Sequence, residues 1–164
     1  MIQQLKTGIR KEPFLWMALI AAAFMFALIS LVNHYCFRTY ALDLGLYTNA
    51  LYDYAHFSGN DSSVFKETTE NILADHFDLY LHLFSPLIYL FGTYTLLIVQ
   101  IVFILIGATG IYRLIEHRFP DSGLKNYALT YFLVFFGVYS ALAFDYHSNV
   151  VASMLVPWLF LAVD

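Results

Sequence analysis

Four long stretches of the chain contain no Asp, Glu, Lys or Arg, and they set the expected architecture. These uncharged stretches are residues 14–37, 79–112, 126–144 and 146–163. A helix needs about 20 apolar residues to cross the hydrocarbon core of a bilayer, with roughly 17–25 tolerated. The first, third and fourth stretches fit one span each. The second is too long for one span and is interrupted by Pro86 and Gly92, so we expect a separate helix over about 76–91 and a span over about 95–112.

The first uncharged stretch follows a basic N-terminal segment, which is also the arrangement of a secretory signal peptide. The apolar region of a signal peptide is only about 7–15 residues long and ends at a cleavage site of small residues. The stretch over 14–37 is longer, and it ends near an Asn-His-Tyr sequence that offers no such site. We therefore expect an uncleaved signal anchor.

The basic residues indicate an orientation in the membrane. Residues 1–12 and 113–125 hold six of the eight Lys and Arg residues, whereas 38–94 is predominantly acidic. Lys and Arg are concentrated in cytoplasmic loops, so we expect a multi-pass protein of the cell membrane with a cytoplasmic N-terminus and with 38–94 outside. The expected spans are about 14–37, 95–112, 126–144 and 148–163. Residues 76–91 then begin and end outside, as a re-entrant or interfacial helix. The alternative, in which 76–91 spans, would place 113–125 outside.

Composition agrees with a membrane protein and argues against other classes. The chain of 164 residues is 60% hydrophobic and 12% charged, with a mean hydropathy of +0.66, whereas a soluble domain is roughly 45–50% apolar and about 25% charged. A single cysteine excludes a disulfide scaffold. A net charge of -4 without a basic stripe argues against nucleic-acid binding. We expect an all-α, polytopic transmembrane helix bundle that forms one unit over 1–164, surrounded by the lipid bilayer.

Residues 43–57 predict a short amphipathic helix in the outer segment. Its apolar positions recur at helical spacing on one face; they are Leu44, Tyr47, Leu51 and Tyr54. Asp43 falls in the first turn of this helix, where a carboxylate favours free N–H groups and the helix dipole.

Acidic and histidine residues fall at three points that the expected topology brings to the outer surface. They are Asp43; Asp75, His76, Asp78 and His82; and Asp145 and His147. Ionisable groups near membrane depth are costly and are usually kept for a partner or for function, and clusters that converge in space are typical of an active site. A simpler explanation stays open for each: a helix cap, a loop end at the interface, and a polar turn between two helices.

Metal binding is a weaker alternative. Asp78 and His82 have an i,i+4 spacing, and carboxylates with histidines suit Mn²⁺, Mg²⁺ or Zn²⁺. No His-Glu-x-x-His motif accompanies them, nor does the sequence contain a phosphate-binding loop, a Gly-x-Ser-x-Gly motif or a Cys-x-x-Cys motif. We assign no metal ligands and leave the cofactor open.

The order of three short motifs resembles a known family. The motifs are Leu42-Asp43-Leu44-Gly45, Ala74-Asp75-His76-Phe77 and Phe144-Asp145-Tyr146-His147. Over about 14–164 the chain resembles a bacterial family of predicted membrane proteins, domain-of-unknown-function family two-zero-seven-nine (DUF2079). That family looks related to the GT-C glycosyltransferases, which transfer sugars from polyprenyl-phosphate donors outside the cytoplasmic membrane.

The sequence departs from the family pattern at several positions. Asn49 stands where the pattern has Gln. Asp78-Leu79 replaces a Ser-Pro pair, and Ser148-Asn149 replaces a Pro-Glu pair, which removes a carboxylate. GT-C proteins also have more spans than we expect here, so we expect the chain to be the N-terminal part of a longer protein.

The resemblance implies part of a GT-C-type glycosyltransferase that takes its sugar from a polyprenyl-phosphate donor. It implies that the catalytic residues are Asp43, His76 and His147 and that the substrate-binding residues are Arg38, Asp75 and Asp145. In this hypothesis the Asp43 carboxylate deprotonates or orients an acceptor hydroxyl. The candidates for stabilising the departing phosphate by positive charge or hydrogen bonds are Arg38, His76 and His147.

Two alternatives to an enzyme remain. Carboxylates and histidines in membrane proteins also serve as proton relays, so the chain is alternatively a transporter part or a non-enzymatic assembly subunit. Transporters usually place such groups near the midplane and in repeated halves, and no repeat is visible. The other alternative is a fragment that is inactive by itself.

Overall fold

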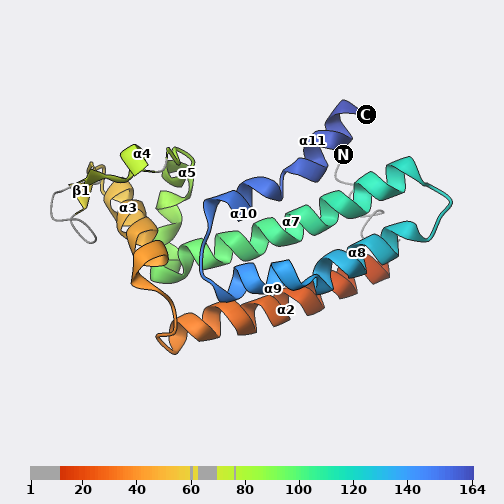
Figure 1. The fold of residues 1–164 in the computed structure, drawn as a ribbon, viewed down its shortest axis with the longest axis horizontal. Coiled ribbons are helices and arrows are strands. Elements are labelled where there is room, and N and C mark those ends of the chain that lie inside the picture. The colour runs from red at the N-terminus through yellow and green to blue at the C-terminus, as the bar shows by residue number, and fades with distance from the viewer. Residues whose placement is uncertain (1–11, 60, 63–69, 76) are drawn as a thin grey trace.

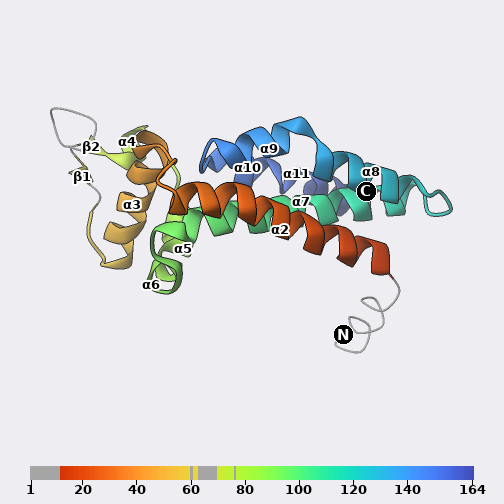
Figure 2. The ribbon, with the colours of Figure 1, turned by 90° about the horizontal axis from the view of Figure 1, so that it is seen from below.

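The computed structural model describes residues 12–59, 61–62, 70–75 and 77–164, and it consists of a long helix bundle with a group of short helices at one end (Figure 1). The bundle helices run along the long axis of the molecule. They are α2 (Pro13–Tyr35), α7 (Thr95–Arg118), α8 (Leu124–Val134), α9 (Phe136–Ala143), α10 (Ser148–Ser153) and α11 (Val156–Val163). Successive passes along the bundle alternate in direction, as Figure 2 also shows. The expected all-α fold class is confirmed.

Three helical runs are long and apolar enough to cross a membrane. They are Pro13–Tyr35, Leu81–Arg118 and Leu124–Ala143. The third run is interrupted at Phe135, whose extended conformation (φ -64°, ψ 128°) separates α8 from α9. The helical segment Ser148–Val163 is shorter than a full span, so its crossing of the membrane stays a prediction. The chain is therefore a helical protein suited to a lipid bilayer.

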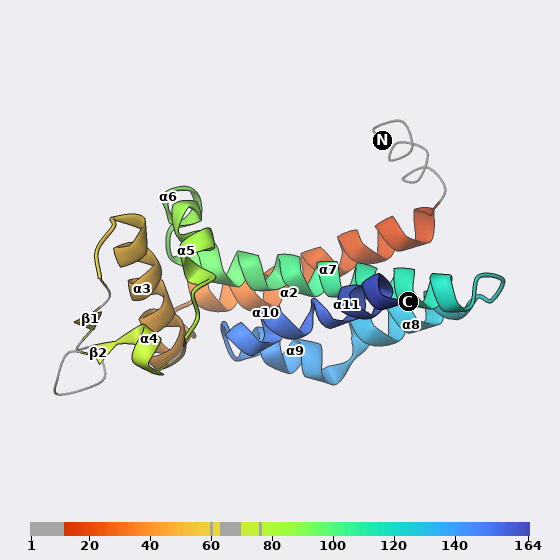
Figure 3. The ribbon, with the colours of Figure 1, turned by 90° about the horizontal axis from the view of Figure 1, so that it is seen from above.

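A glycine divides the long run Leu81–Arg118. Gly92 has φ 54° and ψ -135°, a conformation that residues with a Cβ rarely adopt. Before it come the short helices α5 (Leu81–Phe84), η2 (Ser85–Leu87) and α6 (Ile88–Phe91), and after it η3 (Gly92–Tyr94) leads into α7. Figures 1 and 3 show α5 and α6 turned away from the direction of α7. The predicted helix over 76–91 is wrong at its start, because the helical backbone begins at Leu81.

The short helices pack against one another at this end of the bundle, which we call the pocket end. The connection after α2 forms a π-helical turn, η1 (Ala41–Gly45), that continues into α3 (Leu46–Ala55). Leu44, Tyr47, Leu51 and Tyr54 are all buried, which confirms the predicted apolar face. A two-residue strand pair, β1 (Asp61–Ser62) with β2 (Glu70–Asn71), and α4 (Ile72–Asp75) lie beyond α3.

Two apolar cores hold these parts together. One lies between α2, α7, α8 and α9 and includes Phe26 and Ile104. The other lies where α3 and α5 meet the start of α7 and includes Leu51 and Tyr146. Many large apolar side chains on the outside of the bundle are exposed, among them Ile20 and Phe136, as expected for helices whose outer faces contact lipid tails.

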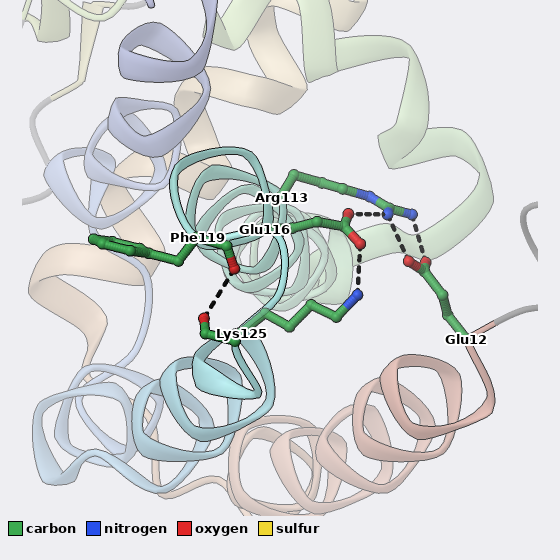
Figure 4. A network of polar contacts seen from close by, with 6 residues as sticks. Glu12, Arg113, Glu116, Phe119 and Lys125 are labelled. Atoms are coloured by element: carbon green, nitrogen blue, oxygen red, sulfur yellow. Dashed lines mark hydrogen bonds and ion pairs between the residues drawn. The ribbon is translucent and has the colours of Figure 1, made fainter.

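The opposite end of the bundle, which we call the basic end, is joined by ion pairs (Figure 4). The Arg113 guanidinium donates to both carboxylate oxygens of Glu12, at 2.7 and 2.6 Å. It also donates to Glu116 at 2.7 Å, and Lys125 donates to the other oxygen of Glu116 at 2.5 Å. The network connects the start of α2, the end of α7 and the start of α8. Which end faces the cytoplasm stays a prediction.

Candidate functional site

A polar cavity of about 240 Å³ lies at the pocket end. Its walls come from two segments that are far apart in the sequence, the η1–α3 region and the turn between α9 and α10. The residues that line it are Asp43, Tyr47, Tyr146, His147, Ser148 and Asn149. Two of the predicted catalytic residues, Asp43 and His147, therefore contribute to one cavity.

Asp43 lies inside the π-helical turn η1 and faces the cavity. Tyr40 is the N-cap of η1 and Gly45 is the N-cap of α3. Neither helix start has a side-chain cap hydrogen bond. Asp43 is the acidic residue in the first turn of η1, so the predicted first-turn position is confirmed, and stabilisation of the helix start through the dipole also fits it. Single π-helical turns are rare and often occur at functional sites.

The His147 ring is fixed by a hydrogen bond to its own neighbour. Nδ1 of His147 lies 2.7 Å from the carbonyl oxygen of Tyr146. A carbonyl oxygen only accepts, so Nδ1 carries a hydrogen in this contact, and Nε2 is the ring nitrogen that takes no part in it.

Gln100 of α7 holds the turn that carries His147. Its side chain is fully buried. Oε1 accepts a hydrogen bond from the His147 backbone N–H at 2.8 Å, and Nε2 donates to the Asp145 carbonyl oxygen at 2.8 Å. Sequence reasoning missed this residue. The available signal was a lone side-chain amide within the uncharged stretch 79–112, since a polar side chain there needs a partner.

Asp145 is buried next to Tyr146, which lines the cavity, and does not itself line it. Its φ of 82° is in the left-handed region, and only 3% of the residue is exposed. Oδ2 accepts a hydrogen bond from the Tyr40 backbone N–H at 2.6 Å, which fixes the connection between α2 and η1. Burial raises the pKa of Asp145, the Tyr40 N–H opposes this, and the nearby Asp43 carboxylate raises the pKa further.

Tyrosine hydroxyl groups form two separate hydrogen bonds beside the cavity. The Tyr47 hydroxyl donates to Oδ2 of Asp78 at 2.9 Å, and the hydroxyls of Tyr80 and Tyr146 lie 2.5 Å apart. Burial is the main cause that raises the pKa of Tyr47 and of Tyr146, so both remain protonated phenols. The sequence identified Tyr47 only as part of an apolar face.

The remaining predicted site residues have different positions. Arg38 is exposed in the connection after α2 and is not among the lining residues. Asp75 is the last residue of α4, and His76 lies outside the described residues. Their proposed roles stay predictions.

Asp78 and His82 do not form a pair. Asp78 precedes α5 and binds Tyr47, whereas the His82 ring stacks on Tyr54 with a centroid distance of 3.9 Å. In the part of the chain that the structure describes, no group of three or more His, Cys, Asp or Glu residues is arranged to hold a metal ion.

Comparison with known proteins gives one match. A family model described as predicted membrane protein (DUF2079) matches residues 33–163, which include every residue lining the polar cavity. Neither the curated proteins nor the solved structures contain a match to the chain. The family match covers well over half of the sequence, and the chain therefore belongs to the DUF2079 family of predicted membrane proteins.

Proposed function

We propose that the polar cavity is the active site of a GT-C-type glycosyl transfer that uses a polyprenyl-phosphate-linked sugar. The observation that carries the proposal is the position of the Asp43 carboxylate and the His147 imidazole on one cavity at the end of an apolar helix bundle. A lipid-linked donor would keep its chain in the bilayer while its sugar reaches the end of the bundle. The resemblance to GT-C proteins supplies the reaction class.

Asp43 is the proposed catalytic base. Glycosyl transfer needs a group that accepts the proton of the attacking hydroxyl, and a positioned carboxylate contributes typically about 10²–10⁴-fold to such a step. The Asp43 side chain is half-buried and faces the cavity. His147 lines the same cavity, and its Nε2 is available to a substrate.

The departing phosphate needs positive charge or hydrogen-bond donors. Arg38 is the proposed group, because its guanidinium suits phosphate oxygens and it lies in the short connection that leads from α2 to Asp43. Asp75 and His76 complete the proposed set through their place in the second motif, and Asp145 contributes by fixing the connection at Tyr40.

The proposal includes an orientation in which the pocket end is extracytoplasmic and the N-terminus is cytoplasmic. It rests on the basic segments 1–12 and 113–125 and the rule that such segments stay inside. Cysteine labelling in intact cells, in a Cys36→Ser background, tests it: Asp61→Cys should be labelled from outside and Ser122→Cys should not.

Transfer of a radiolabelled sugar from a polyprenyl-phosphate donor, measured in membranes that contain the protein, tests the reaction. Asp43→Asn should lower the rate by about 100-fold or more with unchanged expression. Asp121→Asn is the matched control, because Asp121 is an exposed residue in the loop at the basic end. Undiminished transfer by Asp43→Asn would exclude Asp43 as the base, and donor binding without any turnover would favour a non-enzymatic membrane protein.

A further inference from the structure

We propose that Phe37 and Phe57 anchor the pocket end in the surface of the lipid bilayer, where their phenyl rings insert between the lipids beside the bundle. The two residues flank the segment that carries Asp43, with Phe37 before η1 and Phe57 after α3. They therefore hold one wall of the polar cavity at the bilayer surface. This placement is independent of the proposed reaction.

Helix α2 ends in a Schellman motif with Phe37 at the position where glycine is the usual residue. The Arg38 N–H donates to the Asn33 carbonyl oxygen at 2.9 Å, and the Phe37 N–H donates to the His34 carbonyl oxygen at 3.0 Å. These two hydrogen bonds define the motif, and its glycine position lies in the left-handed region. Phe37 has φ 54° there. Glycine adopts this conformation without strain because it has no Cβ, whereas a bulky residue in it is an outlier.

Helix α3 ends in the same way, with Phe57 at the glycine position. The Ser58 N–H donates to the Asp53 carbonyl oxygen at 2.9 Å, and the Phe57 N–H donates to the Tyr54 carbonyl oxygen at 3.1 Å. Phe57 has φ 57°. Two helix ends at the pocket end therefore carry phenylalanine where glycine would be less strained.

Packing within the described part of the chain does not offset this strain. Phe37 is 95% exposed and Phe57 is 101% exposed. Asp145, the third non-glycine residue with a positive φ among the described residues, is by contrast buried and accepts a hydrogen bond from the Tyr40 N–H. Strained residues persist where their surroundings compensate the strain, so a partner outside the described chain accounts for the two phenyl rings.

The length of α2 identifies the bilayer as the partner of Phe37. The 23 residues of α2 rise about 34 Å at 1.5 Å per residue, and the hydrocarbon core of a bilayer is about 30 Å thick. Helix α2 is apolar enough to cross it and ends at Tyr35. Phe37 therefore lies at the boundary between lipid tails and water, where exposed aromatic side chains insert.

Phe57 reaches the same boundary beside α6. The Tyr89 hydroxyl of α6 donates to the Ala55 carbonyl oxygen at 2.8 Å, and the end of α3 and α6 project together beyond one side of the bundle (Figures 2 and 3). Leu90 of α6 is also exposed, and residues 79–112 contain no Asp, Glu, Lys or Arg. An uncharged projection with exposed apolar side chains suits a lipid surface better than water.

The charge of this region indicates how the anchors act. Residues 38–94 are predominantly acidic, and anionic lipids attract basic segments, not acidic ones. Insertion of apolar rings is therefore the anchoring force, and it should not require anionic lipid.

Spin labelling in nanodiscs of phosphatidylcholine tests the anchors. Labels at Phe37→Cys and Phe57→Cys, each in a Cys36→Ser background, are compared with Ile20→Cys on the exposed face of α2 and with Asp121→Cys in the exposed loop of the basic end. The measurement is accessibility to oxygen, which concentrates in lipid, relative to a water-soluble nickel chelate. We expect this ratio at positions 37 and 57 to be several-fold higher than at 121 and to approach that at 20. It should be unchanged in nanodiscs that contain phosphatidylglycerol.

A second pair of variants keeps the backbone and changes only the ring of Phe57. The label is placed at Ser58→Cys, which is exposed, and Phe57 is replaced by Asn or by Trp. Phe57→Asn tolerates the left-handed region but cannot insert into lipid, so chelate accessibility at 58 should rise several-fold. Phe57→Trp keeps an aromatic anchor and should leave it unchanged. Thermal melting of each variant reports whether it folds.

Labels at 37 and 57 that are as accessible to the chelate as the label at 121 would overturn the proposal, and so would a label at 58 that does not respond to Phe57→Asn. Shielding from both oxygen and the chelate would mean a protein contact, such as a second copy of the chain, and would overturn the assignment to lipid. Inserted labels in a protein without sugar transfer would support the anchors and count against the proposed reaction alone.

Discussion

The Gln100 side chain and the His147 backbone are joined by a hydrogen bond of 2.8 Å between Oε1 and N–H. The same amide donates to the Asp145 carbonyl oxygen, so a residue in the middle of the chain clamps both sides of the turn that carries the cavity. Gln100 is completely buried, where an unpartnered polar group is costly. The position of His147 relative to Asp43 therefore depends on a residue that touches neither ligand nor cavity.

Gln100→Leu should destabilise the protein by about 2–4 kcal/mol, because it leaves the His147 N–H and the Asp145 carbonyl oxygen without this partner in a buried place. Thermal unfolding in detergent measures the effect. Gln100→Glu keeps an acceptor for His147 and loses the donor to Asp145, so we expect a loss of stability intermediate between wild type and Gln100→Leu. Thr109→Val in the same helix is the control, since the Thr109 hydroxyl donates to the Leu105 carbonyl oxygen within α7. Equal stability of Gln100→Leu and Thr109→Val would contradict the clamp.

Gly110→Ala should separate α7 from α11. A Cβ at Gly110 would lie 2.7 Å from Nε1 of Trp158 and 3.1 Å from Cβ of Pro157, and Trp158 is also held by its hydrogen bond to the Ile106 carbonyl oxygen at 2.9 Å. Overpacking of this kind costs typically about 1–3 kcal/mol. The measurement is the melting temperature in detergent.

Two other glycines provide the comparison for Gly110. A Cβ at Gly107 would meet not only Sδ of Met154 at 2.6 Å but also its Cβ at 3.0 Å and its backbone Cα at 3.2 Å, which a change of the Met rotamer cannot move away, so Gly107→Ala should also be destabilising. A Cβ at Gly123 would find its nearest neighbour only at 3.9 Å, so Gly123→Ala should have little effect. A Gly110→Ala variant as stable as Gly123→Ala would show that α11 moves freely against α7.

Glu12 and Arg113 should be energetically coupled across the basic end (Figure 4). Their contact is bidentate, and the Glu12 side chain is 13% exposed, but the Arg113 side chain is 36% exposed, so solvent screens the pair. A double-mutant cycle with Glu12→Gln and Arg113→Gln should give a coupling free energy of about 0.5–1 kcal/mol, and 1 M salt should reduce it. A coupling of zero at low salt would mean that the network does not join α2 to α7.

The raised pKa of Asp145 predicts a pH dependence of stability. Burial makes the folded state bind the Asp145 proton more tightly than the unfolded state does, so this carboxyl group lowers the free energy of unfolding as the pH rises from about 3.9, its unfolded value, through the folded pKa. Each unit between the two pKa values corresponds to about 1.4 kcal/mol. Asp145→Asn keeps an acceptor for the Tyr40 N–H and removes the charge.

The measurement is the melting temperature of wild type minus that of Asp145→Asn between pH 4 and pH 8. This difference should become more negative with rising pH and then level off. Asp121→Asn, at the exposed loop of the basic end, should give a flat difference. A difference that grows more positive with pH would mean that the folded state favours the ionised Asp145 carboxylate.

The helical membrane architecture could be predicted from the uncharged stretches. A helix in hydrocarbon has to be apolar along about 20 residues, and the residues of one stretch are enough to show whether it meets this requirement. The apolar face over Leu44 to Tyr54 could be predicted for a similar reason, since helical periodicity is local. The start of the helix at Leu81 could not, because the residues before it are fixed by a non-local contact, Asp78 with Tyr47, and not by their own propensity.

The sequence by itself therefore determined which segments suit the bilayer and where the basic and acidic residues gather. It also identified Asp43 and His147 as candidate site residues. The tertiary structure decided that these two residues share a cavity, that Asp145 is buried next to Tyr146 and does not line it, and that Gln100 and Ser148 belong to the site. The physical reason is that apolarity and helical period are properties of neighbouring residues, whereas a cavity lined by Asp43, Tyr47 and residues 146–149 forms only after segments distant in sequence have packed together.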